Sequence, residues 1–440
     1  MPPLHRLRYM TGTALLAVAS LAGNVSAQEE PDTAQERTTL RVYLDCQRCD
    51  FDHFRREVTF VDYMRDQGTA EVHVLVTSQG TGAGGSRYTF YFIGQQQFEG
   101  RQDTLFYTST QNMTDDEVRT GLTRTFALGL VPYAARTGIG PGLNVMFEGA
   151  EEADAPRGTP QDDPWNLWVF RLRAGGAVEG ESRQSSASMD ASVSANRTTE
   201  ALKFDVNANG RYEEEHFELS DGEEITSLTR NAELQSTIVF SLSPHWSAGF
   251  QGTINTSTRS NYDLVLRGSP AIEFSMYPYE ESTRRQITFM YTLGPVYYRY
   301  DEETLFQEIE ETRLQQQLDV GSSFRQPWGD LNFSVEWSNY LHDWDLHRLE
   351  VDGGLDIRLF RGFSLDIRGS VARIKDQLNV PLEDISDEDI LLELRELGTD
   401  FEYEFDIGIS YTFGSAFNNV VNPRMWRGGG GGFGGFGFND

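Results

Sequence analysis

FEYEFDIGISYTF (residues 401–413) alternates between apolar and polar or small residues along its whole length. The apolar positions are Phe401, Tyr403, Phe405, Ile407, Ile409, Tyr411 and Phe413. Three of the positions between them are Glu402, Glu404 and Asp406. Successive side chains of a β-strand point to opposite faces, so the pattern predicts a strand with one apolar face and one acidic face.

The same alternation recurs upstream, and it predicts about twelve strands in all. The segments are 168–179, 184–196, 202–212, 228–242, 246–260, 266–277, 286–298, 311–325, 331–337, 349–359, 363–371 and 401–413. Alternate connections are tight, as in SLSPHW (241–246) and LFRGF (359–363). The others are long and acidic, as in EEEHFELSDGEEIT (213–226) and the segment 375–400.

Short turns on one side and long loops on the other are typical of outer-membrane β-barrels. A soluble β-sandwich also alternates, but its loops need not sort by length. The sequence therefore predicts a mainly β protein, a transmembrane antiparallel β-barrel of about 12 strands with a small N-terminal α+β periplasmic domain. An even number of strands leaves both ends of the barrel in the periplasm.

The first residues carry the features of a secretory signal peptide. Arg6 and Arg8 precede the apolar run ALLAVASLAG (14–23), and VSA (25–27) supplies small residues before a cleavage point after Ala27. The apolar run is too short to span a bilayer as a helix. We expect residues 1–27 to be removed on export.

The rest of the chain divides by composition. We expect residues 28–38 to be a disordered N-terminus and 39–147 a periplasmic α+β domain. Residues 148–164 form an acidic linker with three prolines, 165–413 the barrel, and 414–440 a C-terminal tail that is rich in Gly and Phe at its end.

Within the small domain, LRVYL (40–44) predicts a strand, and the apolar spacing from Phe51 to Met64 predicts a helix. Three further strands follow, and Thr114 with Glu117 forms a capping box before a second helix that ends near residue 135. This order of elements resembles the N-terminal periplasmic domain of TolB-like proteins.

Cys46 and Cys49 are the chain's two cysteines. In an exported protein their spacing favours a structural disulfide at the junction between strand and helix. A redox-active pair at a helix N-terminus and a metal site with His53 are the alternatives.

The formal net charge of −30 argues against nucleic acid as a partner, since phosphate contacts need a basic footprint. No cofactor or metal site is predicted.

Three phrases resemble the DUF481 group of uncharacterised, YdiY-like outer-membrane proteins. They are YPYEESTRRQITFMYTLGPVYYRYDEET (277–304), RQPWG (325–329) and YTFGSAFNNVVNPR (411–424). The resemblance implies an outer-membrane β-barrel and no established activity or catalytic residue.

The polar positions of the strands carry charges of both signs, which we expect to face the lumen. The candidate lumen-facing charges are Arg171, Arg173, Arg348, Asp356, Arg358, Asp366, Arg368, Glu402, Glu404 and Asp406. They either brace a narrow, filled barrel or line a hydrated pore that filters solutes by charge.

Two other stretches suggest partners or activity. Asp406, Gly408, Tyr411 and Phe413 resemble the signal that the barrel-assembly machinery recognises. YLHDWDLHR (340–348) places His342, Asp343, Asp345 and His347 in an expected exposed loop, which is a solvated polar loop, a divalent-cation site or part of a surface hydrolase. In the segment 386–398, Ser386 and a stripe of apolar residues predict a short helix within a loop, packed over the barrel rim.

The leading functional hypothesis is a passive or weakly selective channel for small solutes in the bacterial outer membrane. The alternative is a structural or scaffolding anchor whose residues 39–147 bind a periplasmic partner, and a surface hydrolase is a third hypothesis. The expected partners are outer-membrane lipid and the barrel-assembly machinery. The N-terminal domain and the C-terminal tail are expected in the periplasm.

Overall fold

The computed structural model describes residues 39–47, 49–82, 84–144, 163–218, 224–382 and 398–420. Several predicted segments lie wholly or mostly outside these ranges. They are the signal peptide, the segment 28–38, the linker, the loop helix at 386–398 and the end of the C-terminal tail.

The N-terminal part is an α+β domain built on a five-stranded sheet with the order β2-β1-β3-β4-β5. Its strands are β1 (Leu40–Asp45), β2 (Val61–Tyr63), β3 (Val72–Gly80), β4 (Ser86–Gly94) and β5 (Gln102–Thr108). Its helices are α1 (Phe51–Glu57) and α2 (Asp115–Ala134). Short 3-10 turns lie at Gln67–Thr69, Gln96–Phe98 and Gly140–Gly142, and a fourth lies outside this domain at Tyr279–Glu281.

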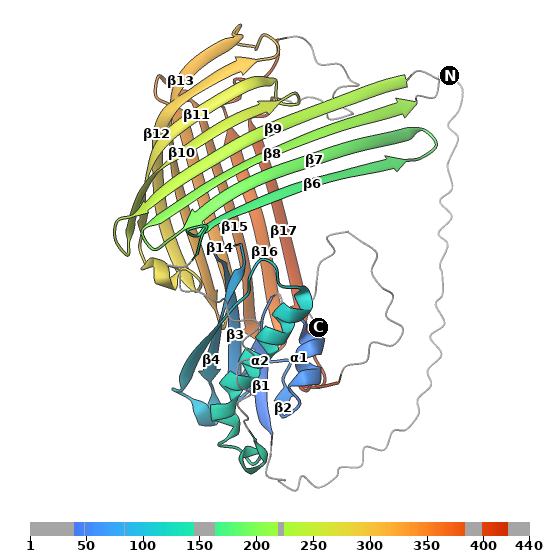
Figure 1. Cartoon of the computed structure of the whole chain (residues 1–440), viewed down its shortest axis with the longest axis vertical. Helices are drawn as coiled ribbons and strands as arrows, with labels where there is room; N and C mark the ends of the chain where they lie inside the picture. Colours follow the sequence, from blue (N-terminus) through green and yellow to red (C-terminus); the bar gives the residue numbers. More distant parts are fainter. Residues whose placement is uncertain are drawn as a thin grey trace, which may run out of the picture. The chain divides into compact units, whose positions relative to one another are not determined.

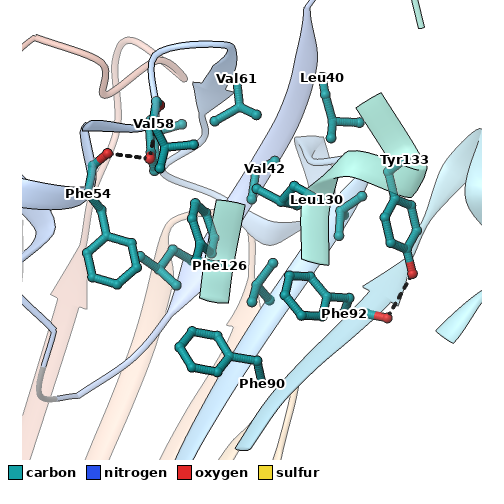
Figure 2. Packing of buried hydrophobic residues seen from close by; sticks show 14 of the residues in the cluster. Leu40, Val42, Phe54, Val58, Val61, Phe90, Phe92, Phe126, Leu130 and Tyr133 are labelled. Carbon is teal, nitrogen blue, oxygen red and sulfur yellow. Dashed lines mark hydrogen bonds between the residues drawn. The ribbon is translucent and has the colours of Figure 1, made fainter. Parts of the chain in front are cut away.

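The core of this domain lies between the sheet and the two helices (Figure 2). Phe54 of α1 packs edge-on against Phe126 of α2, and both are fully buried. The Tyr133 hydroxyl donates to the Phe92 carbonyl at 3.1 Å, which satisfies the one polar group that this ring brings into the core. Thr114 and Glu117 form the predicted capping box at the start of α2.

The first helix is shorter than its apolar spacing predicts. α1 ends at Glu57, and Val61 belongs to β2, which pairs in parallel with β1 through Leu40 opposite Val61. Val61 is buried as predicted, but as a strand residue. The extra strand makes the order of elements β-α-β-β-β-β-α in place of the expected β-α-β-β-β-α.

The second part of the chain is a 12-stranded sheet in which each strand pairs antiparallel with its neighbour in sequence (Figure 1). The strands are β6 (Trp168–Gly180), β7 (Gln184–Thr198), β8 (Leu202–Glu218), β9 (Glu224–Ser241), β10 (Trp246–Ser257), β11 (Tyr262–Ser275), β12 (Arg285–Tyr300), β13 (Glu310–Gln326), β14 (Gly329–Tyr340), β15 (Asp343–Phe360), β16 (Phe363–Ile374) and β17 (Phe401–Tyr411).

The fold class and the predicted number of strands are confirmed. The strands are 11 to 18 residues long, and Figure 1 shows the sheet curving strongly along its length. β6 and β17 are its two edges, and in the described residues no ladder joins them. None of the described helices is long and apolar enough to cross a membrane.

Two segments expected as loops are mostly strand. The acidic stretch 213–226 is taken up by β8, which runs to Glu218, and by β9, which starts at Glu224. The stretch 340–348 is a tight turn at Leu341 and His342 followed by β15. In both places the ladder with neighbouring strands continues past the point where charged residues suggested a loop.

Candidate functional site: the two faces of the twelve-stranded sheet

The strand register separates a polar face from an apolar one. Residues directly opposite each other on antiparallel strands share a face. One such row crosses five strands from Ser323 through Asn332, Gly354 and Arg368 to Asp406. Every member of this row is polar or glycine, so at least this half of the sheet has a continuous hydrophilic side.

The polar face continues to the other edge of the sheet. Arg173 of β6 lies opposite Ser192, which lies opposite Asn209, and the row continues through Glu233 to Asn255. Arg171 begins the neighbouring row opposite Ser194. Hydrophilic side chains therefore lie on the same face of β6 to β10 and of β13 to β17, and the row that joins them on β11 and β12 carries Val265 and Tyr298.

All of the charges predicted to face a lumen lie on this polar face. On β15 to β17, Asp356 is opposite Asp366 and Arg368 is opposite Asp406. The remaining members of the set are Arg171, Arg173, Arg348, Arg358, Glu402 and Glu404, each on the same side of its strand.

The cations of this set pair with different kinds of partner. Arg368 bonds to Asp366 on its own strand at 3.0 Å, and Arg348 bonds to Asp376 at 3.3 Å. Beside Arg368, a hollow of about 400 Å³ is lined by residues that include Asp352, Glu404 and Asp406. Arg171 and Arg173 lie on the opposite edge strand, so the structure does not bring them to the acids of β17.

The opposite face of the sheet is apolar and exposed. Tyr403, Phe405 and Ile407 of β17 are 72%, 66% and 62% exposed, and Leu172 of β6 is 79% exposed. Soluble monomers rarely expose contiguous apolar patches larger than a few hundred Å². One face of the sheet is therefore polar, and the opposite face exposes an apolar surface of the kind that transmembrane barrels turn towards lipid.

Aromatic rings gather on the apolar face at the strand ends that are joined by short turns. Trp168 contacts Phe204 with ring centroids 5.2 Å apart, and Trp246 contacts Phe274 at 4.8 Å. The rings of Phe360, Phe363, Tyr411 and Phe413 form a third group near the β15–β16 turn. Aromatic girdles at the ends of an apolar band mark the membrane–water interfaces of transmembrane barrels.

The spacing of aromatic residues along β17 fits the thickness of such a band. Tyr403 and Tyr411 are separated by about 26 Å along an extended strand, or about 20 Å in height at the usual tilt of a barrel strand. Phe405, Ile407 and Ile409 lie between them on the same face. The alternation was predicted from the sequence but this banding was not, although the positions of the aromatic residues within each strand could have revealed it.

The α+β domain and the sheet belong to one compact unit and meet at the turns of the later strands. Arg358 donates two hydrogen bonds to the Asp45 carboxylate at 2.7 and 3.1 Å, and its guanidinium lies over the Tyr43 ring. His73, fully buried, contacts the same carboxylate at 3.1 Å. Arg358, predicted as a lumen charge, is therefore engaged by the N-terminal domain.

The electrostatics of Asp45 follow from these contacts. Burial alone would raise the pKa of Asp45, but hydrogen bonds from His73 and Arg358, together with the charge of Arg358, hold that pKa well below its usual range. Asp45 is therefore ionised at neutral pH, and the domain presents a fixed negative charge to Arg358.

Two further contacts fix the domain at neighbouring turns. The Gly362 amide donates to the Asp66 carboxylate at 3.0 Å, in a turn where Gly362 has φ +72° and a Cβ would meet the Thr412 carbonyl. After β17, the chain pairs with the edge strand β2, since the Asn418 amide donates to the Tyr63 carbonyl at 2.8 Å. The residues that make this interface are far apart in sequence, so no local pattern identifies them.

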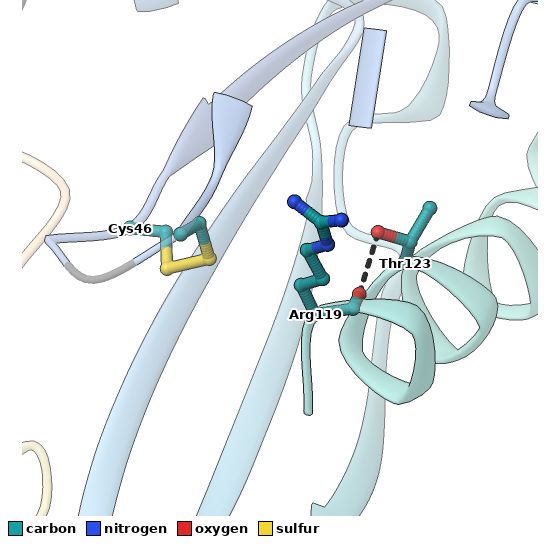
Figure 3. The surroundings of a disulfide bond; sticks show 4 residues. Cys46, Arg119 and Thr123 are labelled. Carbon is teal, nitrogen blue, oxygen red and sulfur yellow. Dashed lines mark hydrogen bonds between the residues drawn. A yellow bond between two sulfur atoms is a disulfide. The ribbon is translucent and has the colours of Figure 1, made fainter. Parts of the chain in front are cut away.

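Cys46 and Cys49 form a disulfide in the structure, between β1 and α1 (Figure 3). The enclosed Gln47 side chain donates to Asp330 and accepts from Arg325, both at 2.9 Å, so the disulfide loop contacts the β13–β14 turn. Among the described residues, no three His, Cys, Asp or Glu side chains gather in a way that could hold a metal ion.

The histidine-containing stretch does not assemble a nucleophile with a base. His342 contacts Arg313, and the His347 ring contacts the Trp344 carbonyl at 3.1 Å. Asp343 accepts from the Asp345 amide. These contacts involve no serine, and they stabilise a strand end.

The predicted assembly signal lies at the end of β17. Tyr411 is 59% and Phe413 79% exposed, and their rings stack 5.6 Å apart. Asp406 and Gly408 lie on the polar face of the same strand. The role of these residues in assembly stays a prediction.

No family model and no curated protein matches the chain. Similar solved structures include the NanC porin (8% identity, 55% of this chain, 99% of that chain, TM-score 0.27). The monoaromatic-hydrocarbon channel CymD is also similar, with 9% identity over 57% of this chain and 87% of that chain and a TM-score of 0.25. For the β domain of the Bordetella autotransporter BrkA, the identity is 10% over 56% of this chain and 98% of that chain, and the TM-score is 0.21. Likenesses this distant carry no inference about this chain, and membership of the DUF481 group stays a prediction.

Proposed function

We propose that this protein is an outer-membrane β-barrel that acts as a passive, weakly selective channel for small solutes. The observation that carries the proposal is the separation of the sheet into one polar and one exposed apolar face, from β6 to β17. In a bilayer the apolar face would contact lipid, and the polar face would line a hydrated interior.

The two edges of the sheet support closure in a membrane. An unpaired backbone N–H or C=O costs several kcal/mol in hydrocarbon, so transmembrane sheets close on themselves. Because each strand runs opposite to the one before it, β6 and β17 also run in opposite directions. They are therefore able to pair antiparallel, which would enclose the polar face.

The expected size of the interior favours passage over a filled core. Barrels of eight strands are just filled by their side chains, whereas those of 16 to 18 strands leave an aqueous channel. Twelve strands lie between these limits. The glycines and serines on the polar rows, such as Gly354 and Ser370, leave room beside the charged side chains.

The proposal includes a location and partners. Export by the N-terminal signal, insertion by the barrel-assembly machinery and contact with outer-membrane lipid follow from the sequence features given above. With short turns on the periplasmic side, the α+β domain and the C-terminal tail would both lie in the periplasm.

A scaffolding role is the second candidate, and the small domain favours it. β5 is an edge strand that pairs only with β4 among the described strands, with alternate residues exposed. Exposed edges accept an added strand from a partner. Co-purification from cells with and without residues 39–147 would test whether this domain recruits a protein.

Single-channel recording of the purified full-length protein in planar bilayers tests the channel directly. Discrete, ohmic steps in KCl support the proposal, and a folded protein that adds no conductance refutes it. Folding is checked independently by the different migration of unheated and heated samples on a gel, so an unfolded preparation is not mistaken for a sealed barrel.

A further inference from the structure

One connection of the sheet crosses the polar face. Residues 375–382, here called the strap, follow β16 and are well buried in part, with Leu378 1%, Asn379 3% and Val380 8% exposed. The strap bonds to the connections between β10 and β11 and between β12 and β13, several strands away in the sheet. Its path therefore spans the curve of the sheet at the end opposite the short turns.

The strap is anchored by an apolar cluster that interrupts the otherwise polar face. Leu378 packs in one buried cluster with Val265, Val296, Tyr298 and Tyr340. These residues lie on the polar side of their strands, since Val265 is opposite Tyr298 and Tyr340 is opposite Gln315. The hydroxyls of Tyr298 and Tyr340 bond to each other at 2.8 Å, so the rings bury without leaving an unpaired polar group.

Backbone and side-chain bonds hold the strap on the C-terminal side of Leu378. The side-chain amide of Asn261 donates to the Asn379 backbone carbonyl at 3.0 Å. The Leu305 amide donates to the Val380 carbonyl at 2.9 Å, and the Leu382 amide donates to the Glu303 carbonyl at 2.8 Å.

Near β16, an ion pair ties the start of the strap to the polar face. Asp376, whose side chain is 12% exposed, bonds to Arg348 at 3.3 Å. The segment is thus attached at its start, at its buried leucine and at its far end, which is the construction expected of a fixed constriction.

We propose that the strap forms the outer constriction of the channel and determines the size of solute that passes, with Leu378 as its anchoring residue. This inference rests on the proposed channel function. In this proposal the size limit of the channel depends on the buried contact of Leu378 with apolar residues of the polar face. The channel would then pass small ions and small hydrophilic solutes.

The test compares two leucine-to-serine variants of the full-length protein. Leu378→Ser removes the buried anchor, whereas Leu242→Ser changes a leucine that is 61% exposed in the short turn between β9 and β10, at the end of the sheet opposite the strap. In planar bilayers with KCl and polyethylene glycols of graded size, Leu378→Ser should raise single-channel conductance and admit larger polymers. Leu242→Ser should match the wild type.

A second variant keeps the proposal testable if Leu378→Ser fails to fold. Asn261 has φ +55°, a conformation that glycine adopts without strain, so Asn261→Gly removes the strap's side-chain tether while preserving the backbone. It should produce a smaller increase in the same direction.

A thiol-labelling readout separates the strap from the channel. The two native cysteines form a disulfide, so Ser370→Cys on the polar face places one reactive thiol beside the hollow lined by Asp352 and Glu404. A methanethiosulfonate reagent should label this thiol faster when Leu378→Ser is also present.

The outcomes are distinct. Faster labelling without conductance in any variant supports the strap as a cover and refutes the channel. Conductance and labelling that are both unchanged by Leu378→Ser and by Asn261→Gly in folded protein overturn the strap proposal and leave the channel standing.

Discussion

The apolar face of β17 provides the sharpest test of membrane insertion. Ile407 lies near the middle of this strand, opposite Ile367 on β16, and is 62% exposed. In a soluble protein, Ile407→Arg would place a charge in water and change stability little. In a bilayer, the same change would bury the guanidinium among lipid chains.

The expected cost is large enough to measure. An arginine on the lipid face of a transmembrane barrel costs about 2–4 kcal/mol at the bilayer midplane. That range corresponds to a decrease of about 30- to 700-fold in the folding equilibrium constant. The lost transfer energy of the isoleucine side chain acts in the same direction.

Gly408→Arg is the matched control because it changes the adjacent residue, at the same depth but on the other face. Gly408 lies opposite Asp366, and an added Cβ would lie at an ordinary contact distance of 3.6 Å from the Asp366 Cβ. An arginine there could pair with this carboxylate, so we expect a much smaller loss than for Ile407→Arg.

The assay is reversible folding of the full-length protein into lipid vesicles, followed by urea titration and gel migration of unheated samples. Refolding without cellular machinery keeps the result independent of any assembly signal in β17. If Ile407→Arg is no more costly than Gly408→Arg, or if both fold in water without lipid, the lipid-facing assignment is wrong.

Three further predictions concern the domain interface and assembly. Asp45→Asn should loosen the domain from the sheet by about 1–3 kcal/mol, after allowance for partial solvent exposure, seen as faster hydrogen exchange in β1. In the folded protein the pKa of Asp45 lies well below its unfolded value of about 3.9. The stabilisation that the ionised Asp45 gives to the interface is therefore complete above a pH of about 3.9, and it is lost as the pH falls towards the folded pKa. Exchange protection that declines between pH 7 and 5 would contradict this. Reduction of the Cys46–Cys49 disulfide should speed exchange at the same interface, and unchanged protection would show that the ring is not needed there. Alanine at Tyr411 and Phe413 should impair insertion in cells while leaving refolding into vesicles intact, and a normal heat-modifiable protein in the outer membrane would count against the signal.

The sequence was sufficient for the fold of the sheet because each strand separates two environments. Alternation in β17 and β8 reports an apolar and a polar side within a single strand, and that information is local. Meander pairing of neighbours then requires only tight turns, such as the one at Gly362.

Local pattern failed where a distant partner decides the structure. Val61 continues the apolar spacing of α1, but pairing with Leu40 draws it into β2 instead. Likewise, Glu213 and Glu215 suggested a loop, whereas their ladder partners on β9, Thr229 and Ser227, extend the sheet. Intrinsic preferences are weak compared with the pairing of a whole strand.

The same limit explains what was missed at the site. Period-two alternation fixes the face on which a side chain lies, so Arg348 and Arg358 were placed on the polar side correctly. It contains no information about depth or about which segment folds onto that face. Arg358 is bound by Asp45, 313 residues earlier in the chain, and Arg348 by Asp376 of the strap. Charges that look equivalent in the sequence thus fall into two groups. Arg358 and Arg348 hold the N-terminal domain and the strap at the two ends of the sheet, whereas Arg368 and Asp406 lie beside the open hollow. A selectivity experiment on the proposed channel should therefore substitute Arg368 and Asp406, because changing Arg348 or Arg358 would alter the structure of one end of the sheet and not the charge beside the hollow.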